Sequence, residues 1–191
     1  MHYRPSKPFG GSLTDTELDH QIIVWQKMGV RVHICHVSEL DLNCHKMRMA
    51  DRGCIYHKSK DWKSIDGLHA ISFCNGGFLD DIKEIKKYAK TTTFVNCMTW
   101  NFPKEIEAQK AGLIDFHLYQ TDHAMDKVSV KLANGPDEYR PIRFKPYFHT
   151  NMFQFHATRR SDEFKFGRIS RGDADKFNTY QFKIYEGMVA P

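Results

Sequence analysis

The sequence predicts an α/β fold, a Rossmann-like parallel sheet flanked by helices on both sides. Stretches with helical and strand periodicity alternate along most of the 191 residues. The strand-like stretches are nearly continuous apolar runs, as in parallel strands that are covered on both faces. Gly, Asn, Thr and Ser follow these strands, at the carboxyl edge where a parallel sheet binds its ligands.

The N-terminal part of the chain predicts one helix and two strands. Residues 14–28 carry apolar side chains at intervals of three and four, and Thr14 forms a capping box with Glu17 at the start. Residues 30–37 alternate apolar and polar side chains, which predicts a strand. The CIYH run at residues 54–57 predicts a second, shorter strand.

The middle of the chain alternates strand and helix. Residues 67–77 form an apolar run that ends in Asn-Gly-Gly, which is typical of a buried parallel strand. Helix 78–90 follows with its apolar side chains on one side, and the β-branched and aromatic residues 91–100 favour a strand. A proline at the first helical position and a closing glycine predict helix 103–112, and residues 113–120 form the next strand.

The C-terminal third is less regular. Thr121 can cap a helix over residues 122–133. Residues 141–148 and 163–169 favour extended chain, and residues 179–188 predict a final helix.

Charge and composition are those of an ordinary globular chain. Charged residues make up 27% and hydrophobic residues 41%, and no apolar run is long enough to span a membrane. The N-terminal residues lack the apolar stretch of a signal peptide, so we expect a cytoplasmic protein. The net charge of +5 suits an anionic partner, but it is spread along the chain as on a solvated surface.

The cysteines favour reduced, buried thiols over disulfides or a metal site. They are Cys35, Cys44, Cys54, Cys74 and Cys97. An odd number in a chain of this size does not suit a disulfide scaffold. Three of them and three histidines fall within 23 residues, but their spacing lacks the close ligand pairs of structural zinc sites. We therefore expect no metal.

Candidate site residues gather where predicted strands end or helices begin. A glycine pair before the first helix suits a phosphate or a sugar hydroxyl, an indole beside amides suits a sugar or a base, and an Asp-His pair suits acid–base chemistry. These candidates are Gly10, Gly11, Ser12, Asn75, Thr99, Trp100, Asn101, Asp122 and His123. Each also has a structural interpretation: a tight turn, a Trp folded onto the core, or a capping Asp beside an exposed His.

A cluster of cations follows the last predicted strand. Arg168, Arg171 and Lys176 come after the glycine that ends it. Two guanidinium groups and an ammonium group suit a diphosphate, because Arg donates in pairs and Lys supplies a point charge. The alternative is a basic, solvated turn.

The order of these segments resembles the GT-B glycosyltransferases, in particular the retaining, GT4-like group (glycosyl transferase group 1) that uses nucleotide sugars. In that group a glycine pair opens the first helix. Residues 146–153 (PYFHTNMF) look like its interdomain segment, and residues 167–170 (GRIS) look like the start of its second domain. The resemblance covers residues 8–188. It implies a Rossmann-like acceptor-side domain over residues 1–155 and the beginning of a donor-binding domain over residues 156–191.

The resemblance also implies a reaction. A sugar would pass from a nucleoside diphosphate donor to an unknown acceptor, with retention and without a cofactor. Arg168 and Lys176 would be catalytic, stabilising the leaving diphosphate. Gly10 and Gly11 would lie against the donor phosphate or the acceptor. The chain ends before the E-x7-E segment of that family's second domain, so we expect this chain alone to be inactive.

Other functions stay open at this point. A non-catalytic nucleotide- or nucleic-acid-binding α/β module would use the same positive charge. The acceptor could be a glycan, a lipid, a small molecule or DNA, since some phage glucosyltransferases of this general fold modify DNA. Apolar surface left uncovered by a missing domain could instead drive formation of a homodimer.

Overall fold

The computed structural model describes residues 17–37, 53–132, 141–145 and 147, together with Tyr180, Lys183, Ile184, Glu186 and Gly187. The chain divides into two compact units, Met1–Phe153 and Gln154–Pro191. The boundary expected from the sequence, after residue 155, lies two residues further along. In the second unit the five described residues are helical, within the helix predicted over residues 179–188.

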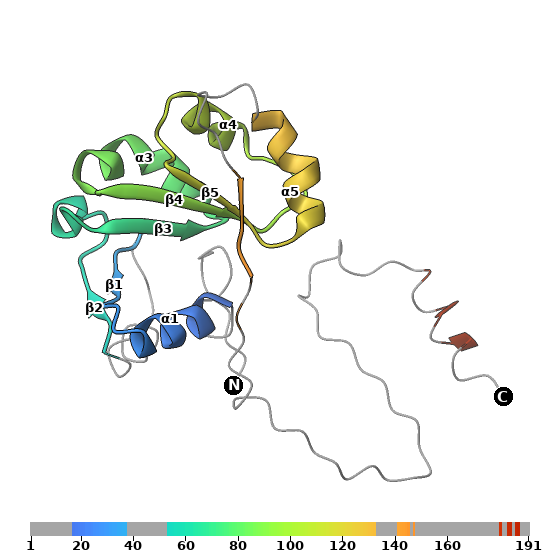
Figure 1. Ribbon diagram of the computed structural model, residues 1–191, viewed down its shortest axis with the longest axis horizontal. Helices are drawn as coiled ribbons and strands as arrows, with labels where there is room; N and C mark the ends of the chain where they lie inside the picture. The colour runs from blue at the N-terminus through green and yellow to red at the C-terminus, as the bar shows by residue number, and fades with distance from the viewer. Residues whose placement is uncertain are drawn as a thin grey trace, which may run out of the picture. The chain divides into compact units, whose positions relative to one another are not determined.

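The larger sheet confirms the predicted α/β class. It contains four parallel strands that are neighbours in the order of the sequence (Figure 1). They are β3 (His69–Phe73), β4 (Thr91–Asn96), β5 (Phe116–Tyr119) and β6 (Pro141–Arg143). Tyr119 is opposite Asn96 on one side and Arg143 on the other, so the carboxyl ends of these strands lie at one edge.

Three helices cross over between these strands and lie along the same side of the sheet (Figure 1). They are α3 (Gly76–Tyr88), α4 (Pro103–Lys110) and α5 (Asp122–Val128). Crossovers of one hand between strands that advance in one direction place every helix on one face. The predicted helix 122–133 instead becomes a 3-10 turn at Ser129–Leu132, since Ser and Val are weak helix formers.

The core lies between this sheet and its helices. Phe94 is fully buried at its centre, and its ring packs against Phe78 of α3, Phe102 and His117. The opposite face is covered only in part, whereas the prediction was of strands covered on both sides. Val95 is fully buried there, but Ile71, Phe116 and Ile142 are 38%, 44% and 42% exposed. In the described part of the chain, α3, α4 and α5 cover one face only.

A smaller parallel sheet precedes the larger one. β1 (His33–Ile34) pairs with β2 (Ile55–Tyr56), and α1 (Glu17–Lys27) packs on them through Ile22. The predicted strand 30–37 is thus much shorter in the structure, because its partner strand has only two residues. The 3-10 turn η1 (Trp62–Ile65) then leads into β3. Among the described helices, none is long and apolar enough to cross a membrane.

The turn from β3 into α3 explains the Asn-Gly-Gly segment. Asn75 caps the helix, because its Oδ1 accepts a hydrogen bond from the Phe78 N–H at 3.2 Å. A Cβ atom on Gly77 would lie 2.8 Å from Cγ2 of Val37, whereas one on Gly76 would meet nothing within 4 Å. Gly77 therefore permits the close approach of α3 to the segment that follows β1.

Substitutions at these two glycines should differ in their effect on stability. We expect Gly77→Ala to lower the free energy of unfolding by roughly 1–3 kcal/mol, because it overpacks the contact with Val37. Gly76→Ala is the matched control, and it should be neutral or stabilising by up to about 1 kcal/mol, since alanine favours a helix. Urea denaturation measures both, and equal effects would contradict the assigned contact.

Candidate functional site

The sequence-predicted residues that the structure describes meet at the carboxyl edge of the larger sheet. They follow three neighbouring strands: Asn75 follows β3, Thr99, Trp100 and Asn101 follow β4, and Asp122 and His123 follow β5. This edge is where parallel sheets bind ligands. The other candidates, Gly10, Gly11, Ser12, Arg168, Arg171 and Lys176, lie outside the described residues.

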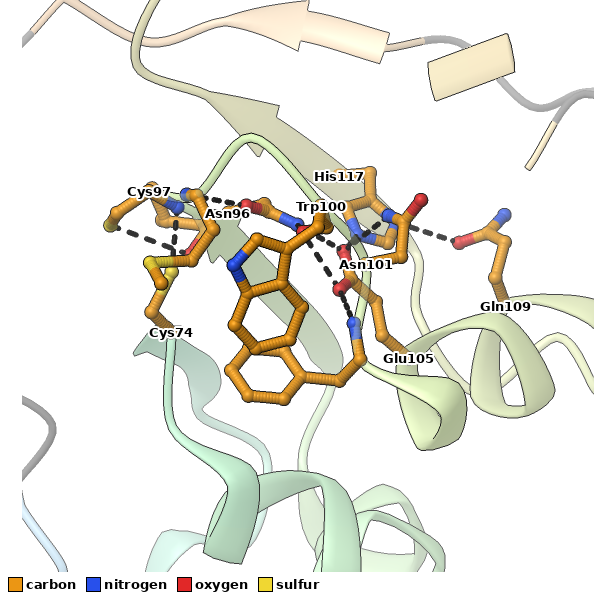
Figure 2. Close-up of polar contacts among 11 residues, drawn as sticks. Cys74, Asn96, Cys97, Trp100, Asn101, Glu105, Gln109 and His117 are labelled. Atoms are coloured by element: carbon orange, nitrogen blue, oxygen red, sulfur yellow. Dashed lines mark hydrogen bonds and ion pairs between the residues drawn. The ribbon is translucent and has the colours of Figure 1, made fainter. Parts of the chain in front are cut away.

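A buried carboxylate holds the residues of this edge by hydrogen bonds from the core side. Glu105 of α4 is fully buried. Its carboxylate accepts hydrogen bonds from Nδ2 of Asn96 at 2.9 and 3.1 Å, from Nδ2 of Asn101 at 3.2 Å and from the Phe102 N–H at 2.9 Å. Nε2 of His117 lies 2.7 Å from Oε1 (Figure 2). The four donor groups suit a carboxylate, which only accepts.

His117 links this carboxylate to the next turn of α4. Its side chain projects from β5 into the core, with Nε2 on Glu105 and Nδ1 at 3.0 Å from Oε1 of Gln109. Because a carboxylate does not donate, Nε2 carries the proton of this pair. The network thus pins α4 to β4 and β5.

The same network fixes the loop that carries Trp100. Oδ1 of Asn96 accepts from the Met98 N–H at 2.7 Å, a side-chain turn that ends β4 earlier than predicted. Nδ2 of Asn96 donates to the Trp100 carbonyl at 3.0 Å. The Trp100 indole packs on Phe102 with 4.6 Å between ring centroids and remains 42% exposed. An aromatic surface is therefore held toward solvent on a supported loop.

The neighbours of Trp100 have different environments. Thr99 is exposed. Asn101 is half-buried, and its NH₂ group is used on Glu105, so its amide supports the loop in this structure. Asn75 likewise uses its side-chain oxygen to cap α3. Among the candidates after β3 and β4, Trp100 and Thr99 are thus the ones that present their side chains outward.

The Asp-His candidate after β5 has a different partner from the one that was predicted. Oδ1 of Asp122 pairs with Nε of Arg143 at 2.9 Å rather than with His123, and Asp122 remains 77% exposed. Thr121 caps α5 through the Ala124 N–H at 2.9 Å. His123 is exposed. Its pairing with Asp122 for acid–base work has no geometric support here.

Arg143 is a site residue that the sequence reasoning missed. Its Nη1 donates to the carbonyls of Tyr119 and Phe144 at 3.3 Å each, while its Nε pairs with Asp122. The guanidinium is therefore fixed at the end of β6, two strands from the Trp100 loop. In the sequence, Arg143 is a single cation in a predicted extended segment. No motif beside it indicated a site.

The burial of the cysteines differs in part from the prediction of buried thiols. Cys54 is buried, but Cys35 and Cys74 are half-buried and Cys97 is exposed. The expectation of buried thiols is therefore wrong for Cys97, because β4 ends one residue before it. The described residues contain no cluster of three His, Cys, Asp or Glu that could hold a metal. Cys44 and His45 lie outside those residues.

Comparison of the chain with family models, with curated proteins and with solved structures gives no match. The chemistry of the carboxyl edge itself therefore indicates what the protein can bind. An exposed indole, a fixed guanidinium and an exposed carboxylate occupy that edge. Such a set can stack on a flat ring and orient hydroxyl or phosphate groups around it.

Proposed function

We propose that this chain carries the acceptor-side domain of a glycosyltransferase that uses a nucleotide sugar. The observation that carries the proposal is the exposed Trp100 indole, held at the carboxyl edge by Asn96 and Phe102. Indoles stack on the apolar face of sugar rings and on bases. The resemblance of the GRIS and interdomain segments to the GT-B enzymes supports the same reaction.

Within this proposal two parts of the chain bind the two substrates. The carboxyl edge of the described sheet binds the acceptor, with Trp100 as the platform and Arg143 as a fixed hydrogen-bond donor. Arg168 and Lys176, which lie outside the described residues, bind and stabilise the donor diphosphate. The transfer needs no cofactor, the protein acts in the cytoplasm, and the acceptor is a glycan, a lipid, a small molecule or DNA.

The test separates these two tasks by calorimetric and thermal-shift titration. We expect UDP or GDP, or a sugar conjugate of one of them, to bind at millimolar or lower concentration, and Arg168→Ala to abolish that response because a bidentate donor is lost. Trp100→Ala should leave the nucleotide response in place but weaken binding of acceptor sugars by roughly tenfold. Trp100→Phe is the matched control, since it keeps an aromatic face.

Two outcomes would count against the proposal. If no nucleotide gave a response, the proposed donor site at Arg168 and Lys176 would be wrong. If the protein then bound DNA or RNA with a steep dependence on salt, the non-catalytic binding module would replace the glycosyltransferase. Gel filtration of the same samples tests the predicted homodimer.

A further inference from the structure

Two cysteines occupy neighbouring positions at the carboxyl edge. Cys74 follows the last residue of β3 and Cys97 follows the last residue of β4, where Phe73 is opposite Val95. Figure 2 shows both side chains on one side of Asn96, away from Glu105 and His117. Neither is in a disulfide. The proposed glycosyl transfer uses neither of them.

The backbone at Cys74 brings its sulfur into the hydrogen-bond ladder. The Cys74 N–H donates to the Val95 carbonyl at 2.9 Å, as a parallel strand requires. The next bond of the ladder would join the Cys97 N–H to the Cys74 carbonyl. Cys74 instead has a φ of 45°, outside the strand region, and the Cys97 N–H donates to Cys74 Sγ. The sulfur thus replaces the carbonyl as the acceptor.

This backbone conformation is unusual for a residue with a side chain. A non-glycine residue in the left-handed region is strained, and such strain is common at functional sites. Among the described non-glycine residues only Lys60 shares it, and Lys60 lies in a turn. At Cys74 the result is a sulfur atom facing a backbone N–H and a second thiol.

The surroundings of Cys74 favour its thiolate. The pKa of Cys74 is lowered, first by a hydrogen bond from the Cys97 side chain; burial opposes this, and the N–H groups of Cys97 and Met98 reinforce it. Charge repulsion from Glu105 also opposes it. Cys35 is half-buried as well, but burial raises its pKa. A thiolate is the reactive form of cysteine, so the two residues differ in expected reactivity.

Contacts beyond the paired part of the two strands bring the sulfurs together. The register ends where Phe73 is opposite Val95, so Cys74 and Cys97 both lie just past the paired residues of β3 and β4. The Cys97 N–H donates to Cys74 Sγ, and the Cys97 side chain also hydrogen-bonds to Cys74. The two side chains are therefore neighbours, as a disulfide requires. The exposed Cys97 also gives small oxidants access to the pair.

We propose that Cys74 and Cys97 form a thiol pair that a hydroperoxide oxidises to a disulfide, with Cys74 as the residue attacked first. The Cys74 thiolate attacks one oxygen of hydrogen peroxide, the O–O bond breaks, and the released hydroxide takes a proton to become water. Cys74 is then a sulfenic acid. The Cys97 sulfur attacks it, the S–O bond breaks, and the thiol proton leaves with the hydroxide as a second water. Two thiols and one peroxide thus give one disulfide and two waters.

The disulfide would join the ends of β3 and β4 directly. It would fix the residue before the Asn75 cap to the start of the Trp100 loop. Oxidation would therefore act on the carboxyl edge whatever ligand binds there. The inference does not rest on the proposed glycosyl transfer.

The test uses the full chain with its native cysteines. Reduced protein is treated with hydrogen peroxide, remaining thiols are alkylated, and peptides are mapped by mass spectrometry before and after dithiothreitol. We expect a disulfide between Cys74 and Cys97 that dithiothreitol reverses. A peroxide-treated protein in which both residues remain alkylatable, or in which the bond joins other cysteines, would overturn the proposal.

Alkylation rates and two variants identify the first reacting sulfur. At neutral pH we expect iodoacetamide to modify Cys74 roughly tenfold faster than Cys35, with a midpoint at lower pH, because more of Cys74 is thiolate. In Cys97→Ser, dimedone should capture a sulfenic acid on Cys74. In Cys74→Ser, Cys97 should stay unlabelled, and equal labelling of Cys97 in that variant would contradict the order of attack. Circular dichroism checks that both variants fold.

Discussion

Replacing Glu105 by alanine should lower the free energy of unfolding by about 3–5 kcal/mol. Glu105 is fully buried and accepts hydrogen bonds from four groups on three segments of the chain. The substitution leaves the Phe102 N–H and His117 Nε2 without this acceptor, and the Asn96 amide keeps only the Trp100 carbonyl. Each buried donor that loses its partner costs about 1–3 kcal/mol. Urea denaturation of both proteins measures the difference.

Glu107→Ala is the matched control for this prediction. Glu107 lies on the same helix two residues away, but its side chain is exposed. Its removal should change the free energy of unfolding by less than about 0.5 kcal/mol. The loss of Glu105 should also release the loop that Asn96 and Asn101 hold, which faster hydrogen exchange at residues 97–102 would show. If the two variants were equally stable, the network would not support the fold.

The second large effect is expected at Phe94. Its side chain fills the centre of the core between the sheet and α3, in contact with the rings of Phe78, Phe102 and His117. Phe94→Ala should lower the free energy of unfolding by about 3–5 kcal/mol, because it removes buried apolar area and leaves a cavity.

Phe116→Ala is the corresponding control on the next strand. Phe116 is opposite Thr93, one residue from Phe94, and its side chain projects to the exposed face of the sheet. The cost of removing it should be under half that of Phe94→Ala. Similar losses in thermal and urea denaturation would mean that the exposed face of the sheet is covered in solution.

The fold class could be predicted because it depends on local patterns. The apolar runs, the proline that begins α4 and the glycine after it placed each element of the larger sheet in the correct order. The exact ends could not be predicted from these patterns. Asn96 ends β4 by a side-chain turn, and Cys74 ends β3 by a positive φ, neither of which alters the apolar pattern.

The candidate site was predicted in part. Parallel strands bring their carboxyl ends together, so Asn75, Trp100 and Asp122 were expected at one edge and lie there. The partners of these residues depend on contacts between distant segments. Glu105 and His117 are twelve residues apart, and the pair forms only because His117 occupies an inward position of β5. A histidine at such a position was the one local sign of the network.

The order of the larger sheet also bears on how it folds. His69 pairs with Thr91, Thr93 with Phe116, and His117 with Pro141, so the paired residues are separated by 22, 23 and 24 positions. The entropy of closing a loop depends on its length, so each strand joins its neighbour at nearly the same entropic cost. Each pairing needs only the strand before it and the helix between. The sequence separation of the paired residues is therefore small for a parallel sheet. A small separation favours rapid folding by stepwise addition of strands.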